Sequence, residues 1–170
     1  AKKLKYLKLK RTSLHGGGKR IGLLAKLPKL RRLDLSGSQN WVHTLFRLET
    51  VENLRFLNLA GTCQRGCALN YPPKLDSLIL AETTLNAKAL DKVGQLKALR
   101  SLNLKGTKGV NDVGLGKLRG LTALRWLNLS MTDVTDAGVA MLKTLRNLKI
   151  LRLSNTKLSD ASAESLAQLT

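Results

Sequence analysis

The sequence predicts an α/β solenoid of about seven repeats, in which short parallel strands line one concave sheet. Three observations favour this fold class. The pattern L-x-x-L-x-L-x-x-T recurs seven times, and all three leucines are present in every copy. The copies start 21 to 26 residues apart, which is the spacing of stacked supersecondary units. The chain is 43% hydrophobic but only 4% aromatic, so leucine must build most of the core.

Each copy predicts one strand. The copies begin at Leu4, Leu30, Leu54, Leu75, Leu99, Leu124 and Leu148. The L-x-L centre alternates with period two, so its leucines lie on one face of an extended segment. Such strands are too short to be stable alone, but in a parallel stack about 4.8 Å apart they share one ladder.

The second halves of the repeats predict different returns to the next strand. Helices are expected after at least the fifth, sixth and seventh strands, within Val110–Leu121, Val134–Leu145 and Leu158–Leu169. Asp112, Thr135 and Ser159 precede apolar positions at helical spacing, so we expect them to be the N-caps.

The other returns are expected to be less regular. The third repeat contains Pro72 and Pro73, which predict an extended crossing because proline lacks an amide donor. The first repeat contains three consecutive glycines at 16–18, which predict a loose loop before Ile21–Leu27.

The repeats resemble the leucine-rich-repeat family, and the resemblance covers essentially the whole chain. The helical second halves, such as VTDAGVAML from Val134, resemble the family branch with the pattern I-T-D-x-G-L-x-x-L. The resemblance implies a horseshoe with helices or extended turns on the convex side. The chain departs from the family at the ninth position, where asparagine is usual and a hydroxyl residue stands in all seven copies. We expect this hydroxyl to turn inward and bond to backbone groups at the bend.

Domain organisation and location follow from weaker signals. We expect residues 1–170 to form a single domain. Neither end carries a polar cap, so the chain is expected to be a fragment or an uncapped part of a larger protein or assembly. No apolar run approaches the ~20 residues of a membrane span, and no signal peptide is visible. Two cysteines fit a reducing compartment, so an intracellular location is expected, with mitochondrion, nucleolus and cytosol all open.

No catalytic residue or cofactor site is predicted. The run HGGGKR lacks the Ser or Thr that a phosphate-binding P-loop needs after its lysine. Asp133 and Asp136 could form a carboxylate pair, but both belong to the repeated helix-start pattern. We therefore expect neither an enzyme nor a small-molecule substrate.

No metal site is predicted either. Zinc needs four ligands, and the only cysteines are Cys63 and Cys67. The two histidines, His15 and His43, stand in different repeats without a nearby partner.

Basic residues concentrate at the amino-terminal end. The net charge is +19, and residues 1–33 hold 12 basic residues and no acid. The simpler interpretation is a solvated face, and the alternative that we favour is docking on a polyanion. The residues predicted to contact RNA are Lys5, Lys8, Lys10, Arg11, Lys19, Arg20, Lys26, Lys29, Arg31 and Arg32. We expect contacts with the phosphate backbone rather than with bases.

The concave face is the predicted protein-binding surface. The third, fifth and seventh positions alternate with the leucines and are expected to point away from the core. The predicted contact residues are Tyr6, Phe56, Asn58, Asn103, Trp126, Asn128, Ile150 and Arg152. Tyrosine and tryptophan are common energetic anchors of interfaces. Alternatively, the aromatic rings lie over a neighbouring loop.

These patterns lead to two functional hypotheses. The first is a non-catalytic scaffold in a ribonucleoprotein of the ribosome or ribosome-assembly type, which contacts RNA through its basic end and proteins through its concave face and ends. The second is a module that recognises protein substrates or ligands with no RNA role, because the T-D-A-G pattern resembles ubiquitin-ligase adaptors and some bacterial effectors. Retention of RNA that depends on salt concentration would distinguish them.

Overall fold

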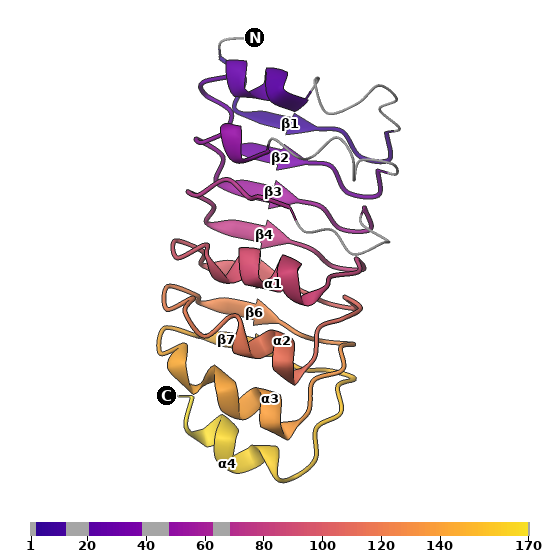
Figure 1. Cartoon of the computed structure of the whole chain (residues 1–170), viewed down its shortest axis with the longest axis vertical. Helices are drawn as coiled ribbons and strands as arrows, with labels where there is room; N and C mark the ends of the chain where they lie inside the picture. Colours follow the sequence, from indigo (N-terminus) through magenta and orange to yellow (C-terminus); the bar gives the residue numbers. More distant parts are fainter. Residues whose placement is uncertain (1–2, 13–20, 39–47, 63–68, 170) are drawn as a thin grey trace.

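The seven predicted strands form one open parallel sheet. The computed structural model describes residues 3–12, 21–38, 48–62 and 69–169. Within them the strands follow chain order, from β1 next to β2 through to β6 next to β7 (Figure 1). The strands are β1 Tyr6–Lys8, β2 Arg32–Asp34, β3 Phe56–Asn58, β4 Ser77–Ile79, β5 Ser101–Asn103, β6 Trp126–Asn128 and β7 Ile150–Arg152.

The leucine register is confirmed. Every strand covers the third to fifth positions of its repeat, so each starts two residues after the first leucine. The fourth-position leucines pair in register across all neighbouring strands, as Leu102 does with Leu127. Leucines of the middle repeats are fully buried, whereas Leu7 in β1 and Leu151 in β7 are half-buried because each has a neighbouring strand on one side only.

Helices cover the other face of the sheet along the later repeats (Figure 1). They are α1 Ala87–Gly94, α2 Asp112–Gly116, α3 Asp136–Ala140 and α4 Ser162–Ala167, with 3-10 helices η1 Ile21–Lys26, η2 Leu48–Thr50 and η3 Met141–Thr144. The helices expected after β5, β6 and β7 are confirmed, and α1 adds one after β4. The described part of the third return, residues 69–74, contains no helix, as the prolines predicted, but it ends in a turn at residues 73–74 instead of crossing in extended form throughout. The glycine-rich segment 16–18 lies outside the described residues.

Two of the three predicted N-caps are corrected. Thr135 caps α3 by accepting from the Ala137 amide. The cap of α2 is Asn111, not Asp112, and α4 begins after Ala161, so Ser159 does not stand at its cap.

The helix-start aspartates tie neighbouring repeats together instead. Asp112 accepts hydrogen bonds from the amide and hydroxyl of Thr135, one repeat later. Asp136 accepts the equivalent pair from Ser159, at 3.0 and 2.5 Å. An aspartate that follows the cap position can therefore bridge to the next repeat.

The ninth-position hydroxyls turn inward, as predicted. Each donates to a carbonyl of a sixth-position leucine in its own repeat or in the preceding one. Thr132, for example, donates to Leu129 at 2.6 Å, and Thr107 donates to Leu80 at 2.8 Å across the repeat boundary. The hydroxyl thus donates to a buried carbonyl at the bend, and among the described residues this carbonyl accepts no hydrogen bond from the ladder of the sheet.

The residue before each hydroxyl adopts a left-handed backbone. The eighth position has φ between 51° and 68° in all seven repeats. Glycine occupies it in three repeats, and the others place Arg11, Glu82, Met131 and Asn155 there. The chain therefore makes the same tight turn after every strand, even where the residue in the left-handed conformation is not glycine.

Candidate functional site

The third-position side chains and most of the fifth-position ones are accessible on the concave face, whereas Asp34 and Asn128 at the fifth position are buried. In β3, β4 and β5 the central leucine is buried and its two neighbours are half-buried. Exposure increases toward the ends, where 46% of Tyr6 and 50% of Ile150 are accessible. Phe56 and Trp126 are half-buried. A partner approaching this face would meet side chains from all seven strands.

Arginines stack on the aromatic rings of this face. In-register pairing places Arg32 between Tyr6 and Phe56 on adjacent strands. Its Cζ lies 4.2 Å from the centre of the Phe56 ring and 5.9 Å from that of Tyr6. At the other end, Cζ of Arg152 lies 5.6 Å from the centre of the Trp126 ring. Such stacking is worth about 0.5–1 kcal/mol at exposed sites and holds the guanidinium plane in place.

The asparagines of the fifth position already take part in hydrogen bonds within the chain. The Oδ1 atoms of Asn58, Asn103 and Asn128 each accept a hydrogen bond from the amide two residues later, at 2.9 to 3.1 Å. Asn128 is only 5% exposed. The carboxamide oxygens thus support the end of the strand, and only the amide nitrogens could donate to a ligand.

The predicted RNA-contacting residues surround the amino-terminal end. Lys19 and Arg20 lie outside the described residues. The other eight are all exposed: Lys5, Lys8, Lys10, Arg11, Lys26, Lys29, Arg31 and Arg32. The nearest acid, Asp34, is 6% exposed, and its Oδ1 accepts from the Ser36 amide at 3.0 Å. Among the described residues, Asp34 forms no ion pair with any of these cations.

A second basic surface was predicted only in part, since Lys5 and Arg31 belong to the predicted RNA-contacting residues but the later members of the surface do not. The second position of the repeat, just before each strand, forms what we call the strand-start row: Lys5, Arg31, Arg55, Asp76, Arg100, Arg125 and Lys149. Its six basic members are exposed. The strands run from left to right in Figure 1, so the row follows the left edge of the sheet. The signal for this row was visible in the sequence, because basic residues stand at the second position in six of the seven copies.

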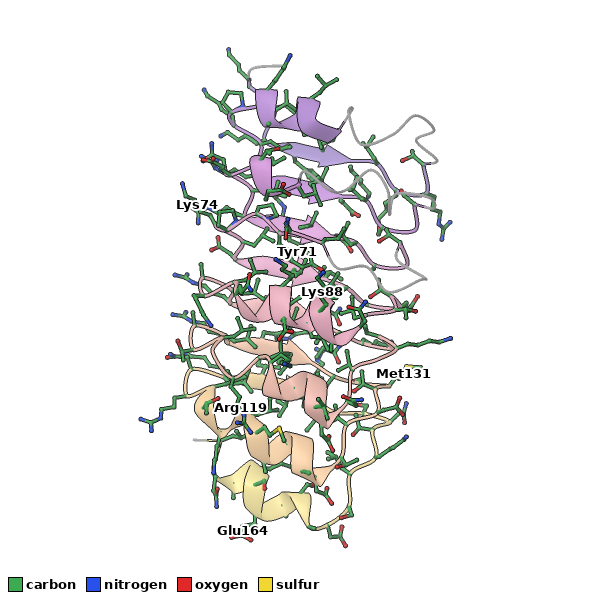
Figure 2. All side chains as sticks on the ribbon, viewed as in Figure 1. Tyr71, Lys74, Lys88, Arg119, Met131 and Glu164 are labelled. Atoms are coloured by element: carbon green, nitrogen blue, oxygen red, sulfur yellow. The ribbon has the colours of Figure 1, made fainter. Side chains whose placement is uncertain are left out.

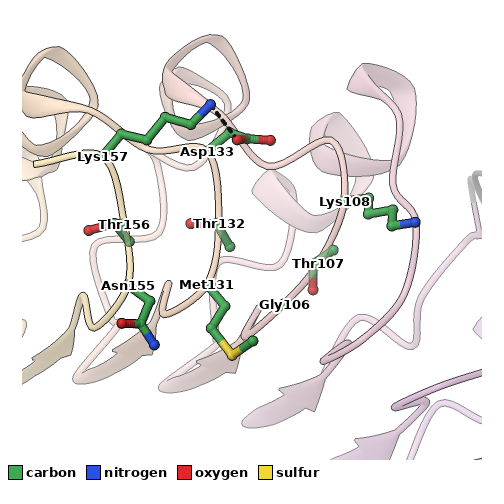
Figure 3. Close-up of a pocket in the computed structure, with 9 residues that line it drawn as sticks. All are labelled: Gly106, Thr107, Lys108, Met131, Thr132, Asp133, Asn155, Thr156 and Lys157. Atoms are coloured by element: carbon green, nitrogen blue, oxygen red, sulfur yellow. Dashed lines mark ion pairs between the residues drawn. The ribbon is translucent and has the colours of Figure 1, made fainter.

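An open hollow lies at the opposite edge, where the last three strands end (Figure 3). It measures about 330 Å³ and is lined by Gly106, Thr107, Lys108, Met131, Thr132, Asp133, Asn155, Thr156 and Lys157. Met131 is 54% exposed, and Nζ of Lys157 lies 2.7 Å from Oδ1 of Asp133. The ionisable groups of the lining are two lysines and an aspartate, and the aspartate already forms an ion pair.

The described residues contain no cluster of three or more histidine, cysteine or acidic side chains that could hold a metal ion. His15, His43, Cys63 and Cys67, the residues weighed for such a role, lie outside those residues. Among the helices that the structure describes, none is both long and apolar enough to cross a membrane.

Comparisons with known proteins agree with the geometry. A family model described as a leucine-rich repeat matches two consecutive segments, residues 121–143 and 144–167. The structure of internalin C2 from Listeria monocytogenes superposes with a TM-score of 0.75 at 24% identity, over 96% of this chain and 66% of that one. Internalin F from the same species gives 0.57 at 22% identity, over 99% and 53%.

This chain thus spans less than two thirds of either internalin. No curated protein matches the sequence. At these identities the likeness to the internalins concerns the fold.

Proposed function

We propose that this leucine-rich-repeat solenoid is a non-catalytic binding module whose concave face holds a partner protein. Residues 1–170 act as one domain in this proposal, since one continuous leucine core joins the described repeats. The stacked clusters of the concave face are the observation that carries it: Tyr6, Arg32 and Phe56 at one end, and Trp126 and Arg152 at the other.

The composition of these clusters suits a protein interface. Tryptophan, tyrosine and arginine are the residue types most enriched among interface hot spots. Stacking fixes the arginines before a partner arrives, so less side-chain entropy is lost on binding. A rigid row of strands also places both clusters at fixed positions on one surface.

A capture experiment with matched variants tests this function. The purified chain and two variants, Trp126→Ser and Val113→Ser, are immobilised and exposed to the same extract, and bound proteins are quantified. Val113 is a suitable control because it is 71% exposed on α2, on the convex side. We expect one or more proteins to be lost with Trp126→Ser and retained with Val113→Ser. Their binding is then measured again with purified components, and equal binding to both variants would refute a concave site.

A second candidate function is docking on RNA, in a ribonucleoprotein of the ribosome or ribosome-assembly type. It is favoured by the exposed basic side chains of the first two repeats, which form no ion pair with Asp34 among the described residues. Without RNA binding, the module would instead recognise protein substrates or ligands, as ubiquitin-ligase adaptors and effectors do.

A filter-binding titration at several salt concentrations separates these alternatives. Replacing Lys8, Lys10, Arg31 and Arg32 by Ser should weaken binding to unrelated RNA sequences by similar factors and flatten the salt dependence. Trp126→Ser should leave RNA binding nearly intact. If the fourfold variant binds RNA as well as the parent, the basic end is only a solvated surface.

A further inference from the structure

The strand-start row is built into the ladder of the sheet. The amide of each second-position residue donates to the carbonyl of the second-position residue one repeat earlier. This chain of hydrogen bonds continues without interruption from Lys149 to Lys5, at 2.8 to 2.9 Å. Seven strands about 4.8 Å apart therefore give a row about 29 Å long. The backbones of its members are fixed, and only their side chains can move.

The row is part of a wider basic edge. The two positions before the first leucine add five exposed cations: Lys3, Lys29, Lys74, Lys97 and Arg146. Lys74 projects from this edge in Figure 2. Together with the row, the described residues of this edge hold eleven basic side chains and two acids, Glu52 and Asp76. This surface therefore contributes +9 to the net charge of +19.

The opposite edge of the sheet is much less charged. The seventh, eighth and tenth positions hold five basic and two acidic side chains among the described residues. One of those acids, Asp133, pairs with Lys157. On the strand-start edge, Asp76 reaches only Arg55, with a 3.8 Å separation between half-exposed groups. The charge is thus concentrated on one edge, and it continues through the carboxy-terminal repeats.

Six like charges at regular short intervals repel one another, so an occupant with regularly spaced negative charge would stabilise the row. A nucleic-acid backbone has this property, because every nucleotide adds one phosphate. An acidic protein would match the row only where its carboxylates recur at the same interval. A single strand can follow a straight row, whereas the backbone of a duplex winds away from it. Four of the six cations are arginines, whose planar fork matches phosphate geometry.

We propose that the strand-start row is a track for the phosphate backbone of single-stranded RNA, extending over all seven repeats. This inference rests on the RNA docking proposed above and extends it from the amino-terminal end to the whole edge. A strand that follows the ~29 Å row runs with its backbone extended along the edge of the sheet. The track requires no recognition of bases, because its members offer only cations to the strand.

A matched pair of triple variants tests the track. The row variant replaces Arg100, Arg125 and Lys149 by Ser, and the control replaces Lys88, Lys105 and Lys143 by Ser. Both remove three exposed cations from the later repeats, but the control residues lie on α1, after β5 and in η3. Thermal unfolding monitored by circular dichroism establishes that both are folded. Binding of a mixed-sequence 12-nucleotide single-stranded RNA is measured by fluorescence anisotropy at several salt concentrations.

We expect the row variant to lose at least tenfold in affinity. The slope of its log affinity against log salt concentration should become shallower by about 2, since it lacks three cations and each single-strand phosphate contact contributes about 0.7. The control should lose less than threefold. Equal losses would overturn the track, because net charge alone would then explain binding. A length series gives a second readout: the affinity of the parent should rise with RNA length until the strand spans the row, and that of the row variant should level off at a shorter length.

Two further variants separate this proposal from the one on which it rests. Asp76→Asn removes the acid from the row and should strengthen RNA binding, so an unchanged or weaker affinity contradicts the track. If the fourfold amino-terminal variant loses RNA while the row variant binds like the parent, RNA docking stands and the track fails. If the parent itself does not bind RNA, both fail. Displacement of the RNA by polyglutamate of equal charge at equal concentration would point to an acidic protein and overturn the assignment.

Discussion

Replacing Leu127 by Ala tests the leucine register at a fully buried position. Leu127 is the central residue of β6, is 0% exposed, and pairs in register with Leu102 and Leu151. Removing three carbon atoms costs about 2.4 kcal/mol at about 0.8 kcal/mol each. Strands on both sides limit collapse of the space left behind, so a cavity cost is added, and the total should be about 2–5 kcal/mol.

The matched control is Leu151→Ala, at the same position of the last repeat. Leu151 is only half-buried and has one neighbouring strand, so its loss should cost about 1 kcal/mol. Urea unfolding monitored by circular dichroism gives both free energies, with the slope compared between variants because repeat proteins can depart from two-state behaviour. A cost below about 0.5 kcal/mol for Leu127→Ala, or equal costs at the two positions, would refute the reasoning.

Other predictions follow from the turns and helix starts. Gly106→Ala should cost about 1 kcal/mol, because φ is +61° but the added Cβ would meet only a side chain at 3.6 Å. Gly109→Ala should cost on the order of 3 kcal/mol, since its Cβ would lie 2.0 Å from a backbone carbonyl. Similar unfolding free energies for the Gly106 and Gly109 variants would contradict this difference. Thr132→Val should cost about 1–3 kcal/mol in the same assay, because it leaves a buried carbonyl without its hydroxyl donor, and a neutral result would make the hydroxyl column dispensable. The hydroxyl of Ser159, and then its amide, hold the pKa of Asp136 below its ordinary 3.8. The stabilisation from this contact is therefore complete at neutral pH and is lost as pH falls below 3.8 through the lowered value. Ser159→Ala should raise the pKa in a carbon-13 titration of the Asp136 carboxyl, and an unchanged value would show that the contact does not form in solution.

The sequence predicted the strands well because their pattern is both short and repeated. Period-two leucines define which side faces the core, and seven copies leave little freedom of register. Helix α1 was not predicted, although Asn86 at its cap and Ala89, Leu90 and Val93 at helical spacing were visible. Its return lacks the polar residue followed by aspartate that starts the other three (Asn111 and Asp112, Thr135 and Asp136, Ser159 and Asp160), so the general capping signal was the better guide.

Details that depend on the neighbouring repeat could not be predicted from one repeat alone. Asn111 and Asp112 are both good capping residues, and the amide and hydroxyl of Thr135 decide which of them bridges the repeats. The local turn does not explain the burial of Asn128 either, since Asn58 and Asn103 make the same hydrogen bond and are half-buried. The candidate surfaces were predicted in part: the concave face was located by alternation, whereas the strand-start row stands just outside the alternating segment.

The helix-start aspartates also determine how the solenoid comes apart. Two successive bridges, from Asp112 to Thr135 and from Asp136 to Ser159, join the last three repeats through their helices as well as through the sheet. A repeat in this group cannot open without breaking contacts on two sides of the molecule. Native-state hydrogen exchange should therefore find the amides of α2 and α3 opening together as one cooperative unit, and Asp112→Ala should divide that unit in two.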